Sequence, residues 1–143
     1  MEIKISKNND HIIIDNKYQI KIVGTFDFPY FCGEDVCYML GYDNMKDALE
    51  KHVGPRQKKM FSEFDENECT IGIPHFNDAD TLDHSMYINV LGFFHLAYYS
   101  SKAEEYQDAV FEDIFPAIRK REKTKTLMKM LLHVTMQLND LMK

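Results

Sequence analysis

Lysine and arginine side chains gather in two segments of this 143-residue chain, and the chemistry available to them is phosphate neutralisation. Residues 44–60 hold five of these side chains against two carboxylates, and residues 117–129 hold six against one. Each phosphate contact releases counterions, so such clusters bind nucleic acid in a strongly salt-dependent way. The candidate phosphate contacts are Lys46, Lys51, Arg56, Lys58 and Lys59 in the first segment, and Arg119, Lys120 and Arg121, followed by Lys123 and Lys125, in the second.

The charge of the whole chain argues against a general nucleic-acid coat. The formal net charge is −6 at pH 7, and residues 61–84 contain seven carboxylates with no Lys or Arg. A local basic patch can still bind phosphate, because salt screens charges that lie more than about 8–10 Å away. From charge alone, however, each basic cluster is more readily an ordinary solvated surface than a binding site.

The spacing of potentially reactive residues predicts no enzyme and no cofactor. The sequence lacks a Ser/His/Asp arrangement, a glycine-rich phosphate loop, an HExxH motif and a cysteine-nucleophile motif. The acidic segment 75–85 lacks the glycine and final glutamate of an EF-hand loop, and the cysteines lack the paired short spacings of a zinc site. We therefore expect no metal ligands among Asp78, Asp80, Asp83, His84, Cys32, Cys37 and Cys69.

The first basic segment must be positioned by two short amphipathic helices within residues 31–53. The glycine at position 41 can end the first helix in the left-handed conformation, and Asp43 or Asn44 can cap the second. This is the outline of a helix-turn-helix, in which Asn44 and His52 of the second helix could reach base edges. An ordinary helical hairpin explains the same pattern and is the commoner structure.

The rest of the chain predicts strands first and helices later. Residues 2–32 alternate as a small antiparallel meander, and residues 69–74 and 86–89 resemble a second pair of strands. Residues 90–100 are almost wholly apolar and predict a buried helix, in which His95 is a core residue. A capping box from Ser101 to Glu104 should open the next helix, with Tyr106, Val110 and Ile114 on its inner face. Pro116 suits the first turn of a last helix.

That last helix carries a heptad-like apolar seam near its end. The seam residues, spaced by four and three positions in alternation, are Leu127, Leu131, Val134, Leu138 and Leu141. The seam predicts self-association, with packing back onto the same domain as the alternative. The predicted fold class is therefore α+β, with a small antiparallel sheet (the meander and a later hairpin) packed with a helix-turn-helix-like pair and C-terminal helices. Residues 1–121 form the domain and 122–143 the heptad-patterned helix.

Three ordered blocks of the sequence resemble the Bro-N domain of the baculovirus-repeated-ORF family and related phage antirepressors. The first is FCGEDVCYMLGY at residues 31–42, and the second is Asn44 followed by Ala48, Leu49, His52 and Val53. The third comprises INVLGF at residues 88–93, SSK at residues 100–102 and VFEDIFPAIRK at residues 110–120. Together the blocks cover roughly residues 18–121.

The resemblance implies a non-enzymatic DNA-binding protein of a large DNA virus or phage that regulates viral or host transcription or replication. The alternative is an antirepressor-like or host-factor-binding module that acts through the C-terminal helix and the acidic loop with little DNA affinity. No apolar run approaches the roughly 18 residues of a membrane span, and the N-terminus lacks a signal-peptide core. We therefore expect an unsecreted protein in the nucleus or cytoplasm of the host cell, with DNA, a second copy or another protein as partner and no membrane.

Overall fold

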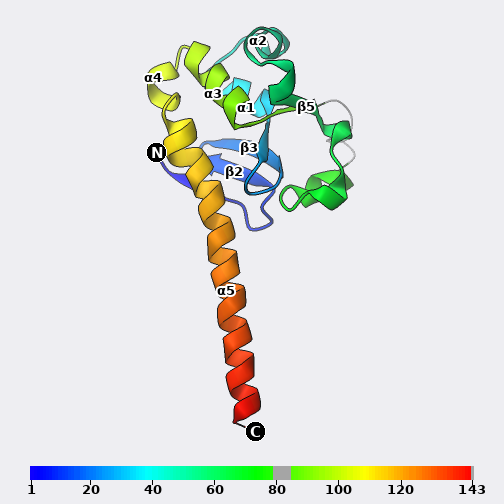
Figure 1. Ribbon diagram of the computed structural model, residues 1–143. Coiled ribbons are helices and arrows are strands. Elements are labelled where there is room, and N and C mark those ends of the chain that lie inside the picture. The colour runs from blue at the N-terminus through cyan, green and yellow to red at the C-terminus, as the bar shows by residue number, and fades with distance from the viewer. Residues whose placement is uncertain (79–84, 143) are drawn as a thin grey trace.

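A six-stranded antiparallel sheet forms the centre of the described chain, which in this computed structural model comprises residues 1–78 and 85–142 (Figure 1). The first four strands form the predicted meander, and β6 pairs with both β4 and β5. The α+β class is confirmed. In spatial order the strands are β1 (Ile3–Ile5), β2 (His11–Ile14), β3 (Tyr18–Gly24), β4 (Pro29–Cys32), β6 (Met86–Ile88) and β5 (Lys58–Met60).

Successive residues of the central strands pack on opposite faces of the sheet, as the period of two requires. On the helix-covered face, Phe31 of β4 pairs in register with Ile88 of β6 and lies within the main apolar core. On the other face, Cys32 and Tyr87 belong to a smaller core with Phe61. That smaller core is covered by short 3₁₀ turns, namely η2 (Phe61–Glu63), η3 (Glu66–Glu68) and η4 (Ile73–Asn77).

Three helices, α1 (Gly33–Leu40), α2 (Met45–His52) and α3 (Val90–Tyr99), contribute apolar side chains to the main core together with the strands. α1 follows β4 without a loop, and α2 and α3 pack against it. The turn η1 (Pro55–Gln57) connects α2 to β5. After α4 (Ala103–Tyr106) and the π-helical stretch η5 (Val110–Ile114), the chain continues without a break into α5 (Phe115–Leu141). Tyr106, Val110 and Ile114 are buried, as predicted.

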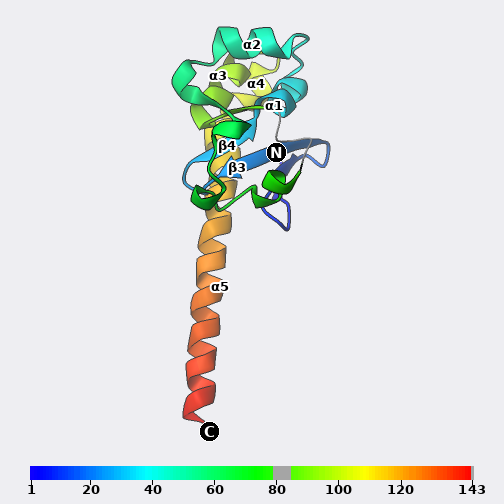
Figure 2. The same cartoon turned by 90° about the vertical axis from the view of Figure 1, so that its right-hand side faces the viewer.

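α5 begins on the domain and then leaves it. Pro116 lies in its first turn, as predicted, and Ile118 is fully buried. The helix packs beside β1 and then projects away from every other element in both views (Figures 1 and 2). The domain boundary predicted at residues 121 and 122 falls inside this continuous helix.

The strand predicted at residues 69–74 is wrong. Ile71 forms only an isolated bridge to Gly24, and the chain then enters η4. Gly72 has a φ of +75°, and a Cβ there would lie 2.2 Å from the carbonyl oxygen of Ile22. This close approach bends the segment out of the sheet, and Pro74 has no N–H to continue a ladder. The true partner of β6 is the basic strand β5, which has no alternating apolar pattern in the sequence.

Two helical predictions also need correction. α3 is buried on one face only, because Leu91, Tyr98 and Tyr99 are 43%, 51% and 59% exposed. His95 is half-buried and its Nδ1 lies 3.1 Å from Oε1 of Gln57. The capping box does not form: instead the Ser100 hydroxyl accepts the backbone N–H of Lys102.

The contact between Phe31 and Phe93 gives a test of this core. Their rings meet edge to face at 5.0 Å between centroids, and both side chains are fully buried. We expect Phe93→Ala to lower the free energy of unfolding by about 3–5 kcal/mol, because it removes this contact and leaves a cavity. Urea denaturation followed by circular dichroism measures the loss. The control is Phe28→Ala, because Phe28 is 77% exposed and should cost less than about 0.5 kcal/mol. Equal losses in the two variants would contradict this packing.

Candidate nucleic-acid interface

The helix pair has the turn and cap that the sequence predicts. Gly41 ends α1 with a φ of +83°, and its N–H bonds to carbonyl oxygens of the last turn. Asn44 caps α2, since its side-chain oxygen accepts the backbone N–H of Asp47 at 3.0 Å. The oxygen of Asn44 is therefore already used inside the protein, and its amide NH₂ is the part left to meet a base.

The outward face of α2 carries balanced charge rather than a basic stripe. Ala48 and Leu49 are buried, while the exposed side chains are Lys46, Asp47, Glu50 and Lys51. Two lysines alternate with two carboxylates, which is typical of a solvated helix surface. Arg56, in the turn after the helix, is exposed and adds an unbalanced positive charge. Lys46, Lys51 and Arg56 are thus the cations of this region that face solvent.

Lys58 and Lys59 are adjacent in sequence but belong to opposite faces of β5. The ammonium group of Lys58 donates to the carbonyl oxygen of Leu49 at 3.3 Å, near the C-terminal end of α2. The ammonium group of Lys59 lies 4.6 Å from the ring centroid of Phe64, on the side of the smaller core. The structure therefore separates these two candidates and gives each a partner within the protein.

A hollow of about 310 Å³ lies between the helix pair and the edge of the sheet. Its apolar lining consists of Met45, Leu49, Met60 and Met86, and its charged lining consists of Glu34, Lys46, Glu50 and Lys58. The two carboxylates repel a phosphate group at this point. Lys46 lies at this hollow, whereas Lys51 and Arg56 do not line it.

His52 joins α2 to α3 by ring packing. Its imidazole stacks on Tyr99 at 4.6 Å with an angle of 13° between the planes, and Tyr42 lies 5.9 Å away. Burial, and then the charge of Lys51, lowers the pKa of His52 below its ordinary value of 6.5. The ring of His52 therefore has a structural role here, and only its free edge is available to a base.

The second basic cluster lies elsewhere on the domain. Arg119 forms an ion pair with Asp27 at 3.3 Å. Lys120 and Arg121 line a hollow of about 520 Å³ beside Ile3 and Ile5 of β1. In both views α2 lies at the end of the domain opposite the point from which α5 leaves (Figures 1 and 2). The structure does not bring the two clusters together on one face.

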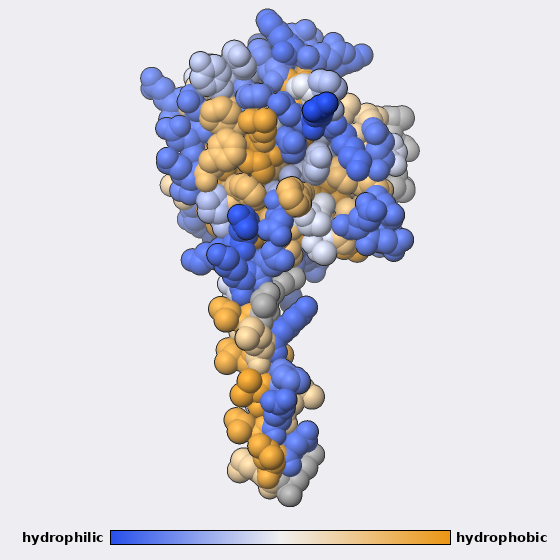
Figure 3. Space-filling view, viewed as in Figure 1, coloured by the Kyte–Doolittle hydropathy of each residue, from blue (hydrophilic) through white to orange (hydrophobic). Residues whose placement is uncertain are grey.

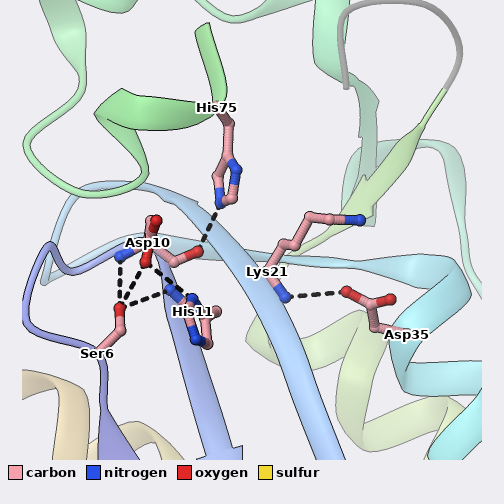
Figure 4. A network of polar contacts seen from close by, with 6 residues as sticks. All are labelled: Ser6, Asp10, His11, Lys21, Asp35 and His75. Carbon is pink, nitrogen blue, oxygen red and sulfur yellow. Dashed lines mark hydrogen bonds and ion pairs between the residues drawn. The ribbon is translucent and has the colours of Figure 1, made fainter. Parts of the chain in front are cut away.

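A Ser–Asp–His group at the β1–β2 turn is arranged for structure rather than for catalysis (Figure 4). The Ser6 hydroxyl donates to the Asp10 carboxylate at 2.6 Å, and Nδ1 of His11 lies 2.8 Å from the same oxygen. The carboxylate thus sits between the other two groups, so the serine has no base beside it. Burial raises the pKa of Asp10, but the hydrogen bond from Ser6 and the charge of His11 outweigh it and lower the pKa overall.

Two contacts tie this turn and the sheet to the rest of the domain (Figure 4). Nε2 of His75, in η4, lies 2.5 Å from the carbonyl oxygen of Asp10. The backbone N–H of Lys21 donates to the Asp35 carboxylate at 2.9 Å, which joins β3 to α1.

The cysteines and acidic residues of the described chain do not form a metal site. Residues 1–78 and 85–142 contain no group of three or more His, Cys, Asp or Glu that could hold a metal ion. Burial raises the pKa of Cys32 to about 12 and that of Cys37 to about 11, so both thiols stay protonated. Asp80, Asp83 and His84 of the acidic segment lie outside the described residues. No helix in the same part of the chain is long and apolar enough to cross a membrane.

An exposed aromatic surface on α3 and η5 was missed by the sequence reasoning. Phe111 and Tyr98 are 46% and 51% exposed, and the half-buried Phe94 contacts both rings. Figure 3 shows a hydrophobic area on this face of the domain. The signal was present, because α3 is apolar all round, whereas packing against one neighbouring face buries only half of a helix.

These observations define a small α+β domain in which paired short helices and an emerging long helix display separate basic clusters. The N-terminal domain of the BRO family (Bro-N) matches residues 19–116, and the chain belongs to this family. It is 40% identical over 114 residues to the putative Bro-N domain-containing protein 201R of Invertebrate iridescent virus 6, covering 73% of this chain and 27% of that protein. It is 36% identical over 132 residues to the putative Bro-N domain-containing protein 019R of Invertebrate iridescent virus 3, covering 84% and 32%.

A similar sequence also occurs outside these viruses. An uncharacterized protein of Haemophilus influenzae is 32% identical over 99 residues, which cover 66% of this chain and 41% of that protein. The chain thus spans about a quarter to two fifths of the length of the curated relatives it matches. No solved structure matches the chain.

Substitution of Asn44 separates its two possible roles. We expect Asn44→Ala to lower the free energy of unfolding by about 1 kcal/mol, because α2 loses its N-cap. Asn44→Ser should retain the cap and most of the stability. A base-reading role then predicts that Asn44→Ser still weakens DNA binding, as measured by titration at fixed salt. Unchanged stability in Asn44→Ala would contradict the cap.

The packing of His52 predicts a pH dependence of stability. Its pKa is lower in the folded chain than in the unfolded chain, so its contribution is present above pH 6.5 and is lost as the pH falls through the folded pKa. Urea denaturation at about pH 5 and pH 7.5 should therefore show a smaller gain with pH in His52→Gln than in the parent chain. Identical pH dependence in the two proteins would contradict this assignment.

Proposed function

We propose that this chain is a non-enzymatic DNA-binding protein of a large DNA virus, regulating viral or host transcription or replication inside the infected cell. The observation that carries the proposal is the set of solvent-facing cations at one end of the domain, Lys46, Lys51 and Arg56. The ion pairs found among the described residues involve Lys4, His11 and Arg119. Lys46, Lys51 and Arg56 take part in none of these pairs and are therefore available to phosphate. Membership of the Bro-N family supports the same interpretation.

The remaining candidates contribute less in this proposal. Lys58 and Lys59 have partners within the protein, so their phosphate contacts require those partners to be released. Asn44 and His52 approach bases with the atoms that their structural roles leave free. Arg119, Lys120 and Arg121 form a second, separate contact surface near the base of α5.

Fluorescence anisotropy with labelled single- and double-stranded DNA tests the proposal. The variant Lys46→Ala/Lys51→Ala/Arg56→Ala removes three phosphate contacts, so the slope of log affinity against log salt should fall by about 2.7 on duplex DNA between about 50 and 200 mM salt. The control is Lys7→Ala/Lys17→Ala, which removes two positive charges from exposed positions on the meander. The control should keep the parent slope. No binding of either DNA at about 50 mM salt would overturn the proposal.

A second candidate function is that of a protein-interaction module acting through the C-terminal helix. The observation that favours it is the exposure of the seam residues, of which even the least exposed, Val134, is 51% exposed. We propose that Leu127, Leu131, Val134, Leu138 and Leu141 mediate self-association. A partner bound through this seam, or an antirepressor-like target, would associate in a salt-insensitive way, whereas phosphate binding weakens steeply with salt.

A further inference from the structure

The free part of α5 exposes far more apolar surface than its seam. Ten Leu, Met and Val side chains between residues 127 and 142 are 51% to 85% exposed. Figure 3 shows them as a hydrophobic band that begins below the hydrophilic base of the helix. Besides the five seam residues they are Met128, Met130, Leu132, Met136 and Met142.

The angular width of this band indicates how many neighbouring helices are needed to bury it. At about 100° per residue, Met130 and Met128 flank the seam and widen the apolar arc to about 160°. Leu132 and Met136 extend it further, with Thr135 and Asn139 as polar residues inside the arc, and the remaining polar side centres on Lys129, His133 and Asp140. A two-helix coiled coil buries only a narrow seam, and a broader stripe is typical of a helix in a larger bundle.

Buried area leads to the same conclusion. A Leu or Met side chain contributes about 80 Å² of apolar area when it is buried. Two copies meeting along the five seam residues would bury about 800 Å² in total, below the roughly 1,200 Å² of a stable interface. Four copies that bury all ten side chains would enclose about 3,200 Å². Shared over the four neighbouring pairs of a four-helix ring, this is about 800 Å² per pair, so buried area favours four copies only through the single core that all four helices enclose.

The charges above the band set the direction of the helices. Lys120 and Lys123 lie on the same side of α5 as the seam, one to two turns before it. Parallel helices would place each Lys120 against its copies, and like charges at this spacing repel. Antiparallel helices separate these lysines by the length of the band. A closed antiparallel assembly has an even number of copies, and the smallest one larger than two has four.

The polar side of the helix argues against a membrane surface as the occupant. Interfacial helices carry lysine and arginine on the polar face, where they meet anionic lipid headgroups. Here that face presents a single lysine, Lys129, with Asp140, His133 and Gln137. Other copies of the same helix complement the band without requiring charge.

We propose that four copies of this chain join through an antiparallel bundle of their α5 helices, so that heads at both ends of the assembly bridge two DNA segments. The bridging step rests on the DNA binding proposed above, whereas the bundle does not. Each head, meaning residues 1–121 of one copy, then binds its own segment through Lys46, Lys51 and Arg56; α2 lies at the end of the domain opposite the point from which α5 leaves (Figure 2).

Light scattering of the 143-residue chain tests the number of copies. The expected mass is four times the 16.9 kDa of one chain. Leu131→Asp should reduce it to the mass of one chain, because it buries a charge in the band. His133→Asp, which adds the same charge on the polar side of the same helix, should leave four copies. A mass of one, two or three copies for the parent chain would overturn the bundle, and a single copy that sediments with anionic vesicles through α5 would assign the band to a membrane.

Disulfide cross-linking tests the direction. In a Cys69→Ser background, where Cys32 and Cys37 are buried, Leu127→Cys and Leu141→Cys are prepared separately and then mixed under oxidation. Antiparallel neighbours should give disulfides between position 127 of one copy and position 141 of another. Bonds between identical positions would instead show parallel neighbours, since disulfides need Cα atoms within about 7 Å. That result would overturn the antiparallel arrangement.

A two-duplex capture assay tests bridging. A biotinylated duplex is held on beads and retention of a second, fluorescent duplex is measured. The parent chain and His133→Asp should retain the second duplex, whereas Leu131→Asp should lose it while still binding one duplex in anisotropy. Single-duplex binding by a four-copy assembly without capture would overturn bridging alone. No DNA binding in anisotropy would overturn the proposed function and bridging together, and the mass and cross-links would still decide the bundle.

Discussion

The direct passage of β4 into α1 is the constraint on which the rest of the domain depends. Phe31 pairs with Ile88 and packs against Phe93, so the strand fixes the sheet to α3. Gly33 then starts α1 without a loop, and a Cβ at this position would lie 2.9 Å from the carbonyl oxygen of Met86. The same Cβ would lie 3.0 Å from Cδ2 of Leu49, so glycine at position 33 allows α2 to pack closely on the start of α1. This packing sets the position of Lys46 and Lys51 on α2.

Local signals in the sequence were sufficient where a residue acts on its own neighbours. Gly41 and Asn44 mark the turn and the cap of the helix pair, and Pro116 lies in the first turn of α5. Predictions failed where a distant contact decides the outcome. Gly72 approaches Ile22 too closely for a strand, and β5 was missed because Lys58 and Lys59 hide its pairing with β6. The one-sided burial of α3 likewise depends on which elements happen to cover it.

The candidate site shows the same division. The basic residues could be named from composition, but their partners could not, because Leu49 and Phe64 meet Lys58 and Lys59 only in the folded chain. The five cations of the first segment are close in sequence, but successive side chains of β5 point to opposite faces of the sheet, which separates Lys58 from Lys59. Charge counting also treated the two basic segments alike, although the fold places one on α2 and the turn after it and the other beside β1 (Figure 1). Lys46, Lys51 and Arg56 are the candidates of the first segment that face solvent together.

If DNA binding occurs as proposed, a single domain with three solvent-facing cations on a chain of net charge −6 should bind DNA weakly and in a salt-sensitive way. More lysines on the same domain would strengthen DNA binding, but in this chain Asp47 and Glu50 on α2, with Glu34 beside it, offset the positive charge. Joining several DNA-binding domains also strengthens binding, because the second contact of a linked assembly forms at a high effective concentration. A straight helix separates the heads by a fixed distance of about 1.5 Å per residue, so the linkage is rigid rather than diffuse. In the proposed assembly, the exposed apolar band of α5 joins the copies, and several copies together compensate for the small positive charge of each α2.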